Sequence, residues 1–334
     1  MKKSFLALLM LLITSGGFSQ NTDIDQIISQ GIKYHDEGKY ELAIEKYKSA
    51  LKINKKSTLA HYEIAYTYFV LQQYDNAIKH SNIVIKQKTD HLEPAFIVLG
   101  NSYDLSGNAK QAIKTYEKGL KKFPESYLLN YNLAFTCYLQ KSYDKAEQAA
   151  IRAIEIKPNH GSSHLVLSGI MQEKGQRIKS VMALYYFLYL EPNSKRSVSA
   201  YENLKRQLQA GVKKKDDKNI NVSLNLGSMN DPFSSVDLML NLKASTRYTD
   251  ENKNKTEIEH FIDMNNSLFG ILSESKNNNK GFWWDFYVSK FSNILKNGHV
   301  ETLSYYISQP ENNDVINNWL KDNSSKVENM KTKI

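Results

Sequence analysis

Residues 99–124 read LGNSYDLSGNAKQAIKTYEKGLKKFP. In this stretch Gly100 and Ala112 each stand a few positions before a tyrosine, and Pro124 closes it. Both small residues have counterparts 34 or 35 positions away, so two series run in parallel: Gly31, Ala65, Gly100, Ala134 and Ser168 in one, Ala43, Ala77, Ala112, Ala146 and Ser180 in the other. Self-similarity at this period indicates an array of helical repeats.

Sterics explain the series of small residues. Each repeat is predicted to be two antiparallel helices, and small residues where they cross let the backbones approach while larger side chains fill the remaining space. Gly38, Gly107 and Gly175 suit the turns between the helices, where a left-handed backbone is often required. One repeat cannot bury its apolar face alone, so we expect the repeats to stack.

The chain resembles the tetratricopeptide repeat family, whose pattern pairs a small residue with an aromatic three positions on, then a second small residue, an aromatic and a proline. Five consecutive units fit, although Lys55 stands at the proline position of the first and Ser81 and Val84 depart from the pattern in the second. The resemblance implies an all-α fold, a right-handed solenoid of helical hairpins with five repeats, closed by a capping helix over residues 194–208. A smaller, mainly helical module is expected to follow.

Four segments are predicted: a signal peptide over residues 1–19, the repeat array with its cap over 24–210, a linker over 211–219 and the second module over 220–334. Alternation from Ile220 to Leu226 predicts an extended segment, and without a convincing second strand we expect it to lie against helices. Thr256 and Glu259 predict a capping box at the start of a long helix. The aromatic cluster around Trp283 and Trp284 is expected to be core rather than a carbohydrate platform, because adjacent helical residues diverge by about 100°.

The amino terminus predicts export. Lys2 and Lys3 precede an apolar run from Phe5 to Ile13, and the small and polar residues up to Gln20 suit cleavage after Ser19. The run is shorter than the roughly 20 residues that span a bilayer, and no later segment is long and apolar enough, so we expect no transmembrane segment in the mature chain. A soluble periplasmic or secreted protein is predicted, with periplasm and cell exterior left open.

Charge and cysteine content exclude some classes of function. The net charge is +9, with lysines spread along the outward helix faces except for a cluster at Lys213, Lys214, Lys215 and Lys218. Such a cluster is usually a solvated linker, and contact with an anionic envelope polymer is the alternative. A nucleic-acid partner is not expected. The single cysteine, Cys137, occupies a core position of the fourth repeat and is predicted to be a buried thiol.

No catalytic motif stands out. The chain has no glycine-rich phosphate loop, no G-x-S-x-G elbow and no histidines at the spacing of a zinc motif. We therefore expect a protein that is not an enzyme, with no catalytic residues, no metal site and no cofactor.

The expected binding surface is the concave face. In the family that the chain resembles, the first helix of each repeat lines this face. The second and fourth repeats each place three aromatic residues there, and rings with polar tips are frequent anchors for protein partners. The resemblance and these rings predict a peptide- or protein-binding site, with an envelope protein as the expected partner, at Tyr62, Tyr66, Phe69, Asn101, Tyr131, Phe135 and Tyr138.

Two alternatives remain for this face. The rings could be ordinary helix packing, or they could be covered by the chain's own carboxyl-terminal module, which would make the protein a structural envelope component. Capture of a partner's terminal carboxylate, as in some relatives, is not expected, because Asn101 is the only residue here of the kind that binds it.

Overall fold

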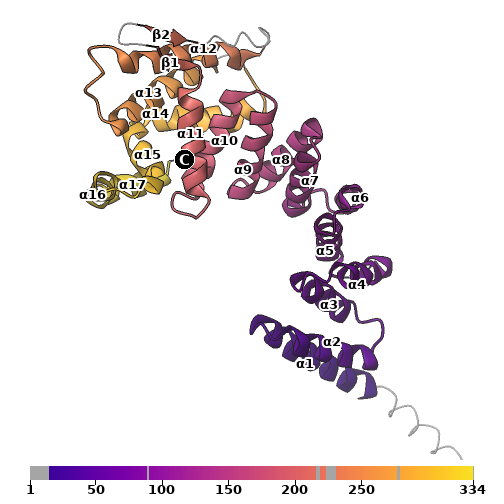
Figure 1. Ribbon diagram of the computed structural model, residues 1–334. Coiled ribbons are helices and arrows are strands. Elements are labelled where there is room, and N and C mark those ends of the chain that lie inside the picture. Colours follow the sequence, from indigo (N-terminus) through magenta and orange to yellow (C-terminus); the bar gives the residue numbers. More distant parts are fainter. Residues whose placement is uncertain (1–14, 89, 216–218, 223–230, 277–278, 334) are drawn as a thin grey trace, which may run out of the picture. The chain divides into compact units, whose positions relative to one another are not determined.

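The computed structural model describes residues 15–88, 90–215, 219–222, 231–276 and 279–333 (Figure 1). Most of these residues are helical, in consecutive helix pairs, which confirms the predicted all-α fold with a helical carboxyl-terminal part. Residues 1–14 of the predicted signal peptide lie outside the described residues. By its internal contacts the chain forms two compact units, Met1–Lys141 and Ser142–Ile334. The predicted segment boundaries do not coincide with this division and stay a prediction.

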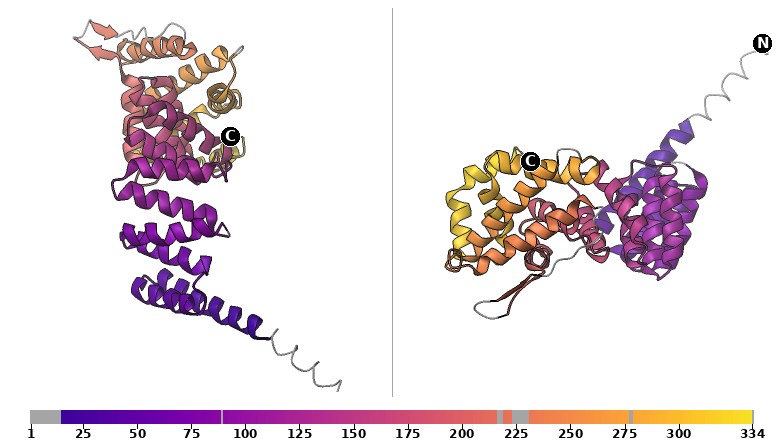
Figure 2. Two further views of the ribbon diagram at one scale, coloured as in Figure 1. Left: turned by 90° about the vertical axis from the view of Figure 1, so that its right-hand side faces the viewer. Right: turned by 90° about the horizontal axis from the view of Figure 1, so that it is seen from above.

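The first unit contains seven helices in its described residues: α1 (Ser15–Asp36), α2 (Tyr40–Ile53), α3 (Thr58–Val70), α4 (Tyr74–Gln87), α5 (Leu92–Leu105), α6 (Ala109–Leu120) and α7 (Tyr127–Leu139). The first three odd-numbered helices pack against the even-numbered helix that follows. The odd-numbered helices also pack against one another in sequence order, so the first helices of the repeats form a continuous layer (Figures 1 and 2).

The turns between paired helices use a left-handed residue at one fixed position. Gly38, Gly107 and Gly175 have φ of 75°, 86° and 69°, which confirms their predicted role. The second and fourth repeats reach the same conformation without glycine, at Gln72 and Lys141, both with φ of 58°. A side chain at such a position is strained, so the turn geometry is imposed by the packing of the repeat.

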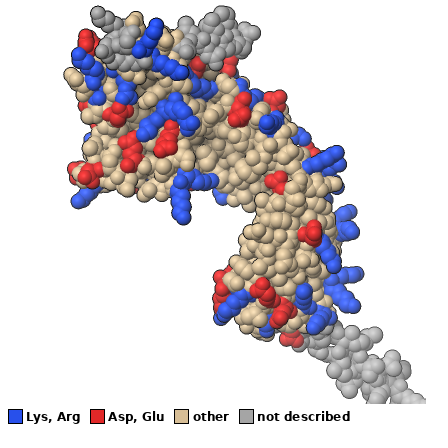
Figure 3. All heavy atoms as spheres, in the orientation of Figure 1, with Lys and Arg blue, Asp and Glu red and all other residues tan. Residues whose placement is uncertain are grey.

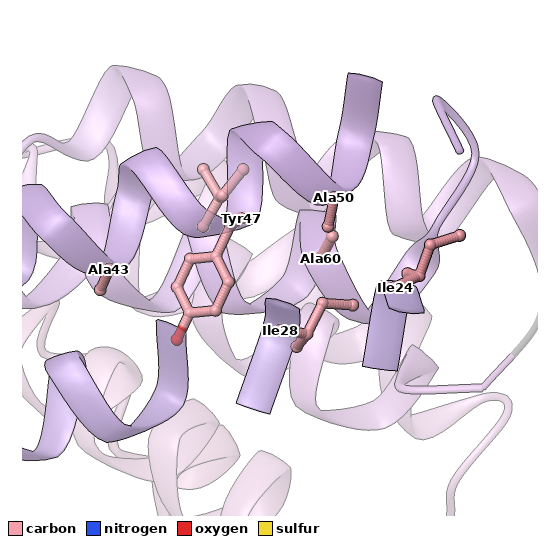
Figure 4. Close-up of a cluster of buried hydrophobic side chains, with 7 residues drawn as sticks. Ile24, Ile28, Ala43, Tyr47, Ala50 and Ala60 are labelled. Atoms are coloured by element: carbon pink, nitrogen blue, oxygen red, sulfur yellow. The ribbon is translucent and has the colours of Figure 1, made fainter. Parts of the chain in front are cut away.

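Helix pairing in the first repeat requires glycine at Gly31. A Cβ atom there would overlap the ring of Tyr47, and a Cβ atom at Gly100 would overlap the ring of Tyr116 in the same way. Tyr47 is completely buried in the cluster that Figure 4 shows, together with Ile24, Ile28, Ala43, Ala50, Ala60 and Ile64. Ile28, which the repeat pattern places on the concave face, therefore belongs to the core.

The repeats alternate in kind. The first and third combine glycine in the first helix with tyrosine in the second, whereas the second and fourth have Ala65 with Ser81 and Ala134 with Ala150 at the corresponding positions. The glycine-free turns and the predicted aromatic triads also belong to the second and fourth repeats. The residues at the helix crossing thus alternate over the first four repeats, and Ser168 and Leu184 of the fifth repeat do not continue the alternation.

The second unit begins with four helices, α8 (Tyr143–Ile156), α9 (Gly161–Glu173), α10 (Arg177–Leu190) and α11 (Ser197–Gln209). Helix α10 is buried from Val181 to Leu188, because α9, α11 and three of the elements introduced below pack on it. The predicted capping helix corresponds to α11, which lies against α10 but is itself partly covered. The repeats of this unit and the carboxyl-terminal helices thus share one core.

A short β-hairpin follows α11. Strands β1 (Val212–Lys214) and β2 (Ile220–Val222) pair antiparallel, with Val212 opposite Val222. The prediction that the extended segment would have no partner strand is therefore wrong for residues 220–222, although their extended conformation and their contact with helix α12 (Pro232–Ser245) are as expected. Residues 223–226 of the predicted segment lie outside the described residues. The partner was missed because lysines at Lys213 and Lys214 are typical of a linker, yet an exposed two-stranded ribbon tolerates them well.

The remaining elements are compact and helical: η1 (Thr246–Tyr248), α13 (Glu257–Ser275), the π-helix η2 (Trp283–Val288), α14 (Ser289–Lys296), α15 (Val300–Ile307), η3 (Gln309–Glu311), α16 (Asp314–Asp322) and α17 (Ser324–Lys331). The capping box of Thr256 and Glu259 is present at the start of α13, as predicted. Helix α17 was not predicted.

Burial settles two expectations about single residues. Trp283 and Trp284 are 8% and 5% exposed, and Trp284 stacks on Phe233, so this pair is core and not a carbohydrate platform. Cys137 is fully buried, as predicted. Across the described ranges, no helix combines the length and apolarity that crossing a membrane requires.

Candidate functional site

Charge separates the two helices of each repeat in the first unit. The second helices α2, α4 and α6 carry three, two and three lysines, whereas α3, α5 and α7 carry no lysine or arginine. In Figure 3, blue side chains project from the margin where α4 and α6 lie, next to a largely uncharged surface. The site described below lies on the lysine-free helices.

Four rings stack in a column on the first of these helices. Tyr66 stacks on His35 of α1 at a centroid distance of 5.1 Å, Tyr62 follows at 6.4 Å, and His91, just before α5, stacks on Tyr62 at 5.6 Å. The angles between successive planes are 24°, 10° and 11°. Tyr66 is 39% exposed. This ring column joins three repeats through their aromatic faces and leaves ring edges toward solvent.

A hollow of about 200 Å³ opens beside the ring column. It is lined by Phe69, Asn101, Asp104, Leu105, Tyr116, Tyr131, Asn132, Phe135 and Thr136. Tyr131 and Phe135 stack at 6.4 Å, and Phe135 and Leu105 are 39% and 60% exposed. The hollow therefore brings together one ring of the first predicted triad and two of the second, although the triads lie two repeats apart in the sequence.

Hydrogen bonds hold the polar residues of the hollow. The Tyr116 hydroxyl donates to Asn101 Oδ1 at 2.7 Å, and the Thr136 hydroxyl donates to Asp104 Oδ2 at 2.9 Å. Burial raises the pKa of Asp104, while the bond from Thr136 acts in the opposite direction. Asn101 and Asp104 are thus fixed in place at the wall of an otherwise apolar hollow.

An equivalent arrangement supports the ring column. Thr67 donates its hydroxyl hydrogen to the carbonyl of Glu63 at 2.8 Å, so His35 donates from Nδ1 to the Thr67 oxygen, also at 2.8 Å. Burial lowers the pKa of His35, which favours the neutral ring in the stack. The side chain of Glu63 is half-buried, and burial together with the charge of Asp36 raises its pKa to about 7.

Of the seven predicted site residues, four line the hollow: Phe69, Asn101, Tyr131 and Phe135. Tyr62 and Tyr66 form the ring column, and Tyr138 is half-buried outside both features. His91 and Glu63 contribute to the site but are not among the predicted residues. The missing lysines of α3, α5 and α7 are a sequence signal that could have drawn attention to Glu63, since it is the only charged residue of α3.

Two polar side chains of the second unit are engaged in packing. Arg177 donates to Asp237, to Asn241 and to the carbonyls of Gln207 and Ala210, and so ties α10 and α11 to α12. His164 is buried, with hydrogen bonds to Tyr287 and to the carbonyl of Pro158. No group of histidine, cysteine or acidic side chains that could hold a metal ion occurs in the part of the chain that the structure describes.

Two family models match the chain, one described as TPR repeat over residues 31–72 and one described as tetratricopeptide repeat over residues 105–168. Both ranges carry the small-residue series and the helix pairs described above. The chain is a tetratricopeptide repeat protein. Repeats of this family act as scaffolds for protein–protein interaction, and here the exposed rings lie on their first helices.

Two curated relatives match part of this tetratricopeptide repeat protein. Protein O-mannosyl-transferase TMTC1 of Homo sapiens is 25% identical over 193 residues, which are 56% of this chain and 22% of the relative. BBSome complex member BBS4 of Bos taurus is 29% identical over 139 residues, 41% of this chain and 26% of the relative. The chain spans about a quarter of the length of these relatives.

The fold of this chain is similar to that of solved protein structures. YrrB, described as a TPR protein with an unusual peptide-binding site, shares 15% identity and a TM-score of 0.45 over 55% of this chain and 97% of its own. PilF of Pseudomonas aeruginosa shares 15% identity and a TM-score of 0.49 over 70% of this chain and 97% of its own. These likenesses concern the helical fold.

Proposed function

We propose that this tetratricopeptide repeat protein is an exported scaffold whose first unit binds a peptide, or a peptide segment of an envelope protein, across α3, α5 and α7. One observation carries the proposal. Exposed rings from two repeats lie on helices that lack lysine: Tyr66 belongs to the ring column, and Phe135 lines the hollow with its fixed polar groups. Soluble surfaces usually keep large rings covered, and exposed clusters of them mark interaction sites.

The size of the hollow fits a side-chain anchor. A volume of about 200 Å³ is comparable to the roughly 150 Å³ cavity that accommodates benzene in a protein core, so one large apolar side chain can enter. Asn101 accepts from Tyr116 through Oδ1, and its Nδ2 group has no acceptor among the described residues. That group can donate to a backbone carbonyl of the partner, which would orient an extended segment.

The test compares two double variants of the full-length chain in capture of proteins from an envelope extract. Tyr66→Ala with Phe135→Ala removes exposed rings from the site, and Leu42→Ala with Ile53→Ala removes similarly exposed apolar side chains from α2. We expect the ring variant to lose proteins that the wild type and the α2 variant retain. Circular dichroism must show equal helicity in all three. Retention of the same proteins by the ring variant would contradict the proposal.

A structural role is the second candidate, with the rings covered by residues 220–334 of the same chain. Modification of tyrosines with tetranitromethane separates the two, because a covered Tyr66 and Tyr131 would be nitrated slowly until the protein unfolds. Rapid nitration of Tyr66 in the native protein would count against self-coverage.

Binding to an anionic envelope polymer is the third candidate. The eight lysines of α2, α4 and α6 favour it, since they share one class of helix. Contacts through exposed lysines weaken as salt rises, because screening shortens the range of the charges to about 8 Å at physiological ionic strength. Capture through the rings is expected to persist at high salt.

Export itself is part of the proposal. It is supported by the basic and apolar pattern of residues 2–13, which lies outside the described residues. Amino-terminal sequencing of the protein purified from its native host should begin at Gln20, and a sequence that begins at Met1 would contradict export. No transferase activity is carried over from the curated relative, because this chain matches only 22% of its length.

A further inference from the structure

The first helices of the second to fourth repeats differ in charge from the rest of this basic chain. α3, α5 and α7 are 13, 14 and 13 residues long and contain no lysine or arginine, whereas the chain average of 44 in 334 would place about five there. They do contain three acids, Glu63, Glu93 and Asp104, close to the roughly four that the average of 35 predicts. Within the first unit these three helices therefore differ from α1, α2, α4 and α6, which all contain lysine, whereas α9 and α13 of the second unit also lack basic residues.

Two of these acids lie half-buried beside the rings without a cation. Asp104 lines the hollow together with Phe69 and Phe135, and its described hydrogen bond comes from the Thr136 hydroxyl. The charge of Glu63 contributes, after burial, to the raised pKa of Tyr62, so this carboxyl group lies near the ring column. Neither acid forms an ion pair with another described residue. A carboxylate withdrawn from water without a positive partner is electrostatically unfavourable, and a cation brought by a partner would relieve this.

We infer that the occupant of this face is an extended basic segment of another protein, with lysine or arginine among large apolar side chains. The inference rests on the proposed function and names the chemical class of its partner. Apolar side chains of the segment fill the hollow between Phe69 and Phe135. Its cationic groups reach Asp104 and Glu63 while their aliphatic stems lie over the exposed rings of Tyr66 and Phe135, where a cation is also attracted by the ring face.

Charge complementarity argues against an acidic occupant. An acidic segment or a free terminal carboxylate would meet Asp104 and Glu63 and find no lysine or arginine on α3, α5 or α7. The lysines of the first unit's even-numbered helices offer such a partner a different surface. In a chain with a net charge of +9, the helices that carry the rings thus together contain acids and no lysine or arginine.

The experiment measures binding of three synthetic peptides to the full-length protein by fluorescence anisotropy at low salt. The peptides are about 12 residues long, with acetylated and amidated ends: one of phenylalanine, leucine and lysine, one with glutamate in place of lysine, and one with serine in place of the apolar residues. We expect the first peptide to bind at least about tenfold more tightly than either of the others.

A pair of charge variants assigns the effect to the site. Asp104→Asn with Glu63→Gln removes two carboxylates beside the rings, and Glu41→Gln with Glu45→Gln removes two exposed carboxylates from α2. The site variant should bind the lysine peptide about tenfold more weakly and lose its preference over the glutamate peptide. The α2 variant should behave as the wild type, because both variants change the net charge equally.

The possible failures are distinguishable. Equal binding of the lysine and glutamate peptides, both dependent on Tyr66 and Phe135, would overturn the inference and leave the proposed function standing. Equal weakening by the site variant and the α2 variant would also overturn it, because a general field effect would then explain the preference. If none of the peptides binds and capture from the extract is independent of the rings, both the inference and the proposed function are wrong.

Discussion

The second helices of the third and fifth repeats, α6 and α10, hold the same place in the repeat and bury different surfaces. α6 buries one face and exposes Lys114 and Lys118, whereas α10 is buried from Val181 to Leu188 beneath the carboxyl-terminal helices. Tyr186 of α10 stands where Lys118 stands in α6. In this pair of helices, the position without lysine is the one that other helices cover.

The same reasoning applies to the first helices of the first unit. α3 and α7 contain no lysine, and α10 contains a single one. Tyr66 of α3 and Phe135 of α7 are nevertheless each 39% exposed. In the second unit the chain itself supplies the cover, through rings such as Phe286 against Tyr186 at 5.2 Å. For α3 and α7 we propose that the cover comes from a partner protein. Four predictions sharpen this comparison.

The largest effect is expected where the cover is already present. Tyr186→Ala in α10 should lower the free energy of unfolding of the second unit by about 3–5 kcal/mol, because it leaves a cavity among His164, Phe286 and Tyr287. Lys118→Ala, at the same repeat position in α6, should change stability by less than about 0.5 kcal/mol. Urea denaturation followed by circular dichroism measures both. Similar losses in the two variants would mean that α10 is not covered as described.

The next effect concerns the crossing of paired helices. Gly31→Ala should destabilise the first unit by about 1–3 kcal/mol, since the new Cβ overlaps the buried Tyr47 ring. Ser168→Ala, at the same position of the small-residue series in the second unit, should cost about 1 kcal/mol, because Ser180 loses its hydrogen bond with Ser168 but keeps the one that it accepts from Gln207. Thermal unfolding measures the loss of stability in both variants. A larger loss for Ser168→Ala than for Gly31→Ala would contradict the tight packing of the Tyr47 ring against Gly31.

A smaller effect is expected from pH at the exposed face. The pKa of Glu63 is about 7, so its carboxyl group gains a negative charge between pH 6 and pH 8, and affinity for the lysine peptide should rise a few-fold over this interval. The neighbouring charge is that of Asp36, while Tyr47 and Tyr62 have raised pKa values and His35 a lowered one, so these three stay neutral.

Glu63→Gln is the control for this pH effect. The variant keeps the shape of the side chain and removes its titration, so the affinity measured by anisotropy should become flat between pH 6 and pH 8. An unchanged slope in the variant would assign the pH dependence to another group.

The smallest effect concerns the turns. Gln72→Gly should stabilise the first unit by about 0.5–1 kcal/mol, because a left-handed backbone with φ of 58° strains a side chain there. Gly175→Ala at the equivalent turn of the second unit should destabilise by a similar amount. Opposite signs of the two changes in thermal unfolding are the expected result, and a loss in both would show that the glutamine side chain contributes packing that outweighs its strain.

Periodic features of the fold could be predicted from the sequence. The two small-residue series, the turn glycines at Gly38, Gly107 and Gly175 and the capping box of Thr256 depend on local geometry, which repeats wherever the same residues recur. The helices that pack over α10 could not be predicted, because their identity depends on contacts between segments far apart in the sequence. Its apolar run from Val181 to Leu188 nevertheless indicated that the helix is buried on all sides.

The candidate site was predicted in part for the same reason. Positions fixed by the repeat, such as Phe69 and Phe135, lie on the hollow as the pattern requires, and the site as a binding surface stays a prediction. His91 lies in the segment where the second repeat departs from the family pattern, so no repeat position could be assigned to it. The burial of Glu63 depends on its neighbours in α1, which the sequence of α3 does not contain.

The alternation of Gly31 with Tyr47 and Ala65 with Ser81 limits how the array could change in length. Copying or deleting a single repeat would place two repeats of the same kind in contact. Two helix pairs that cross at a glycine, or two first helices that carry aromatic triads, would then follow one another. A gain or loss of a pair, about 69 residues, would keep each crossing beside its proper neighbour. Under the proposed function, a change of length by one such pair would change the number of ring-bearing repeats by one.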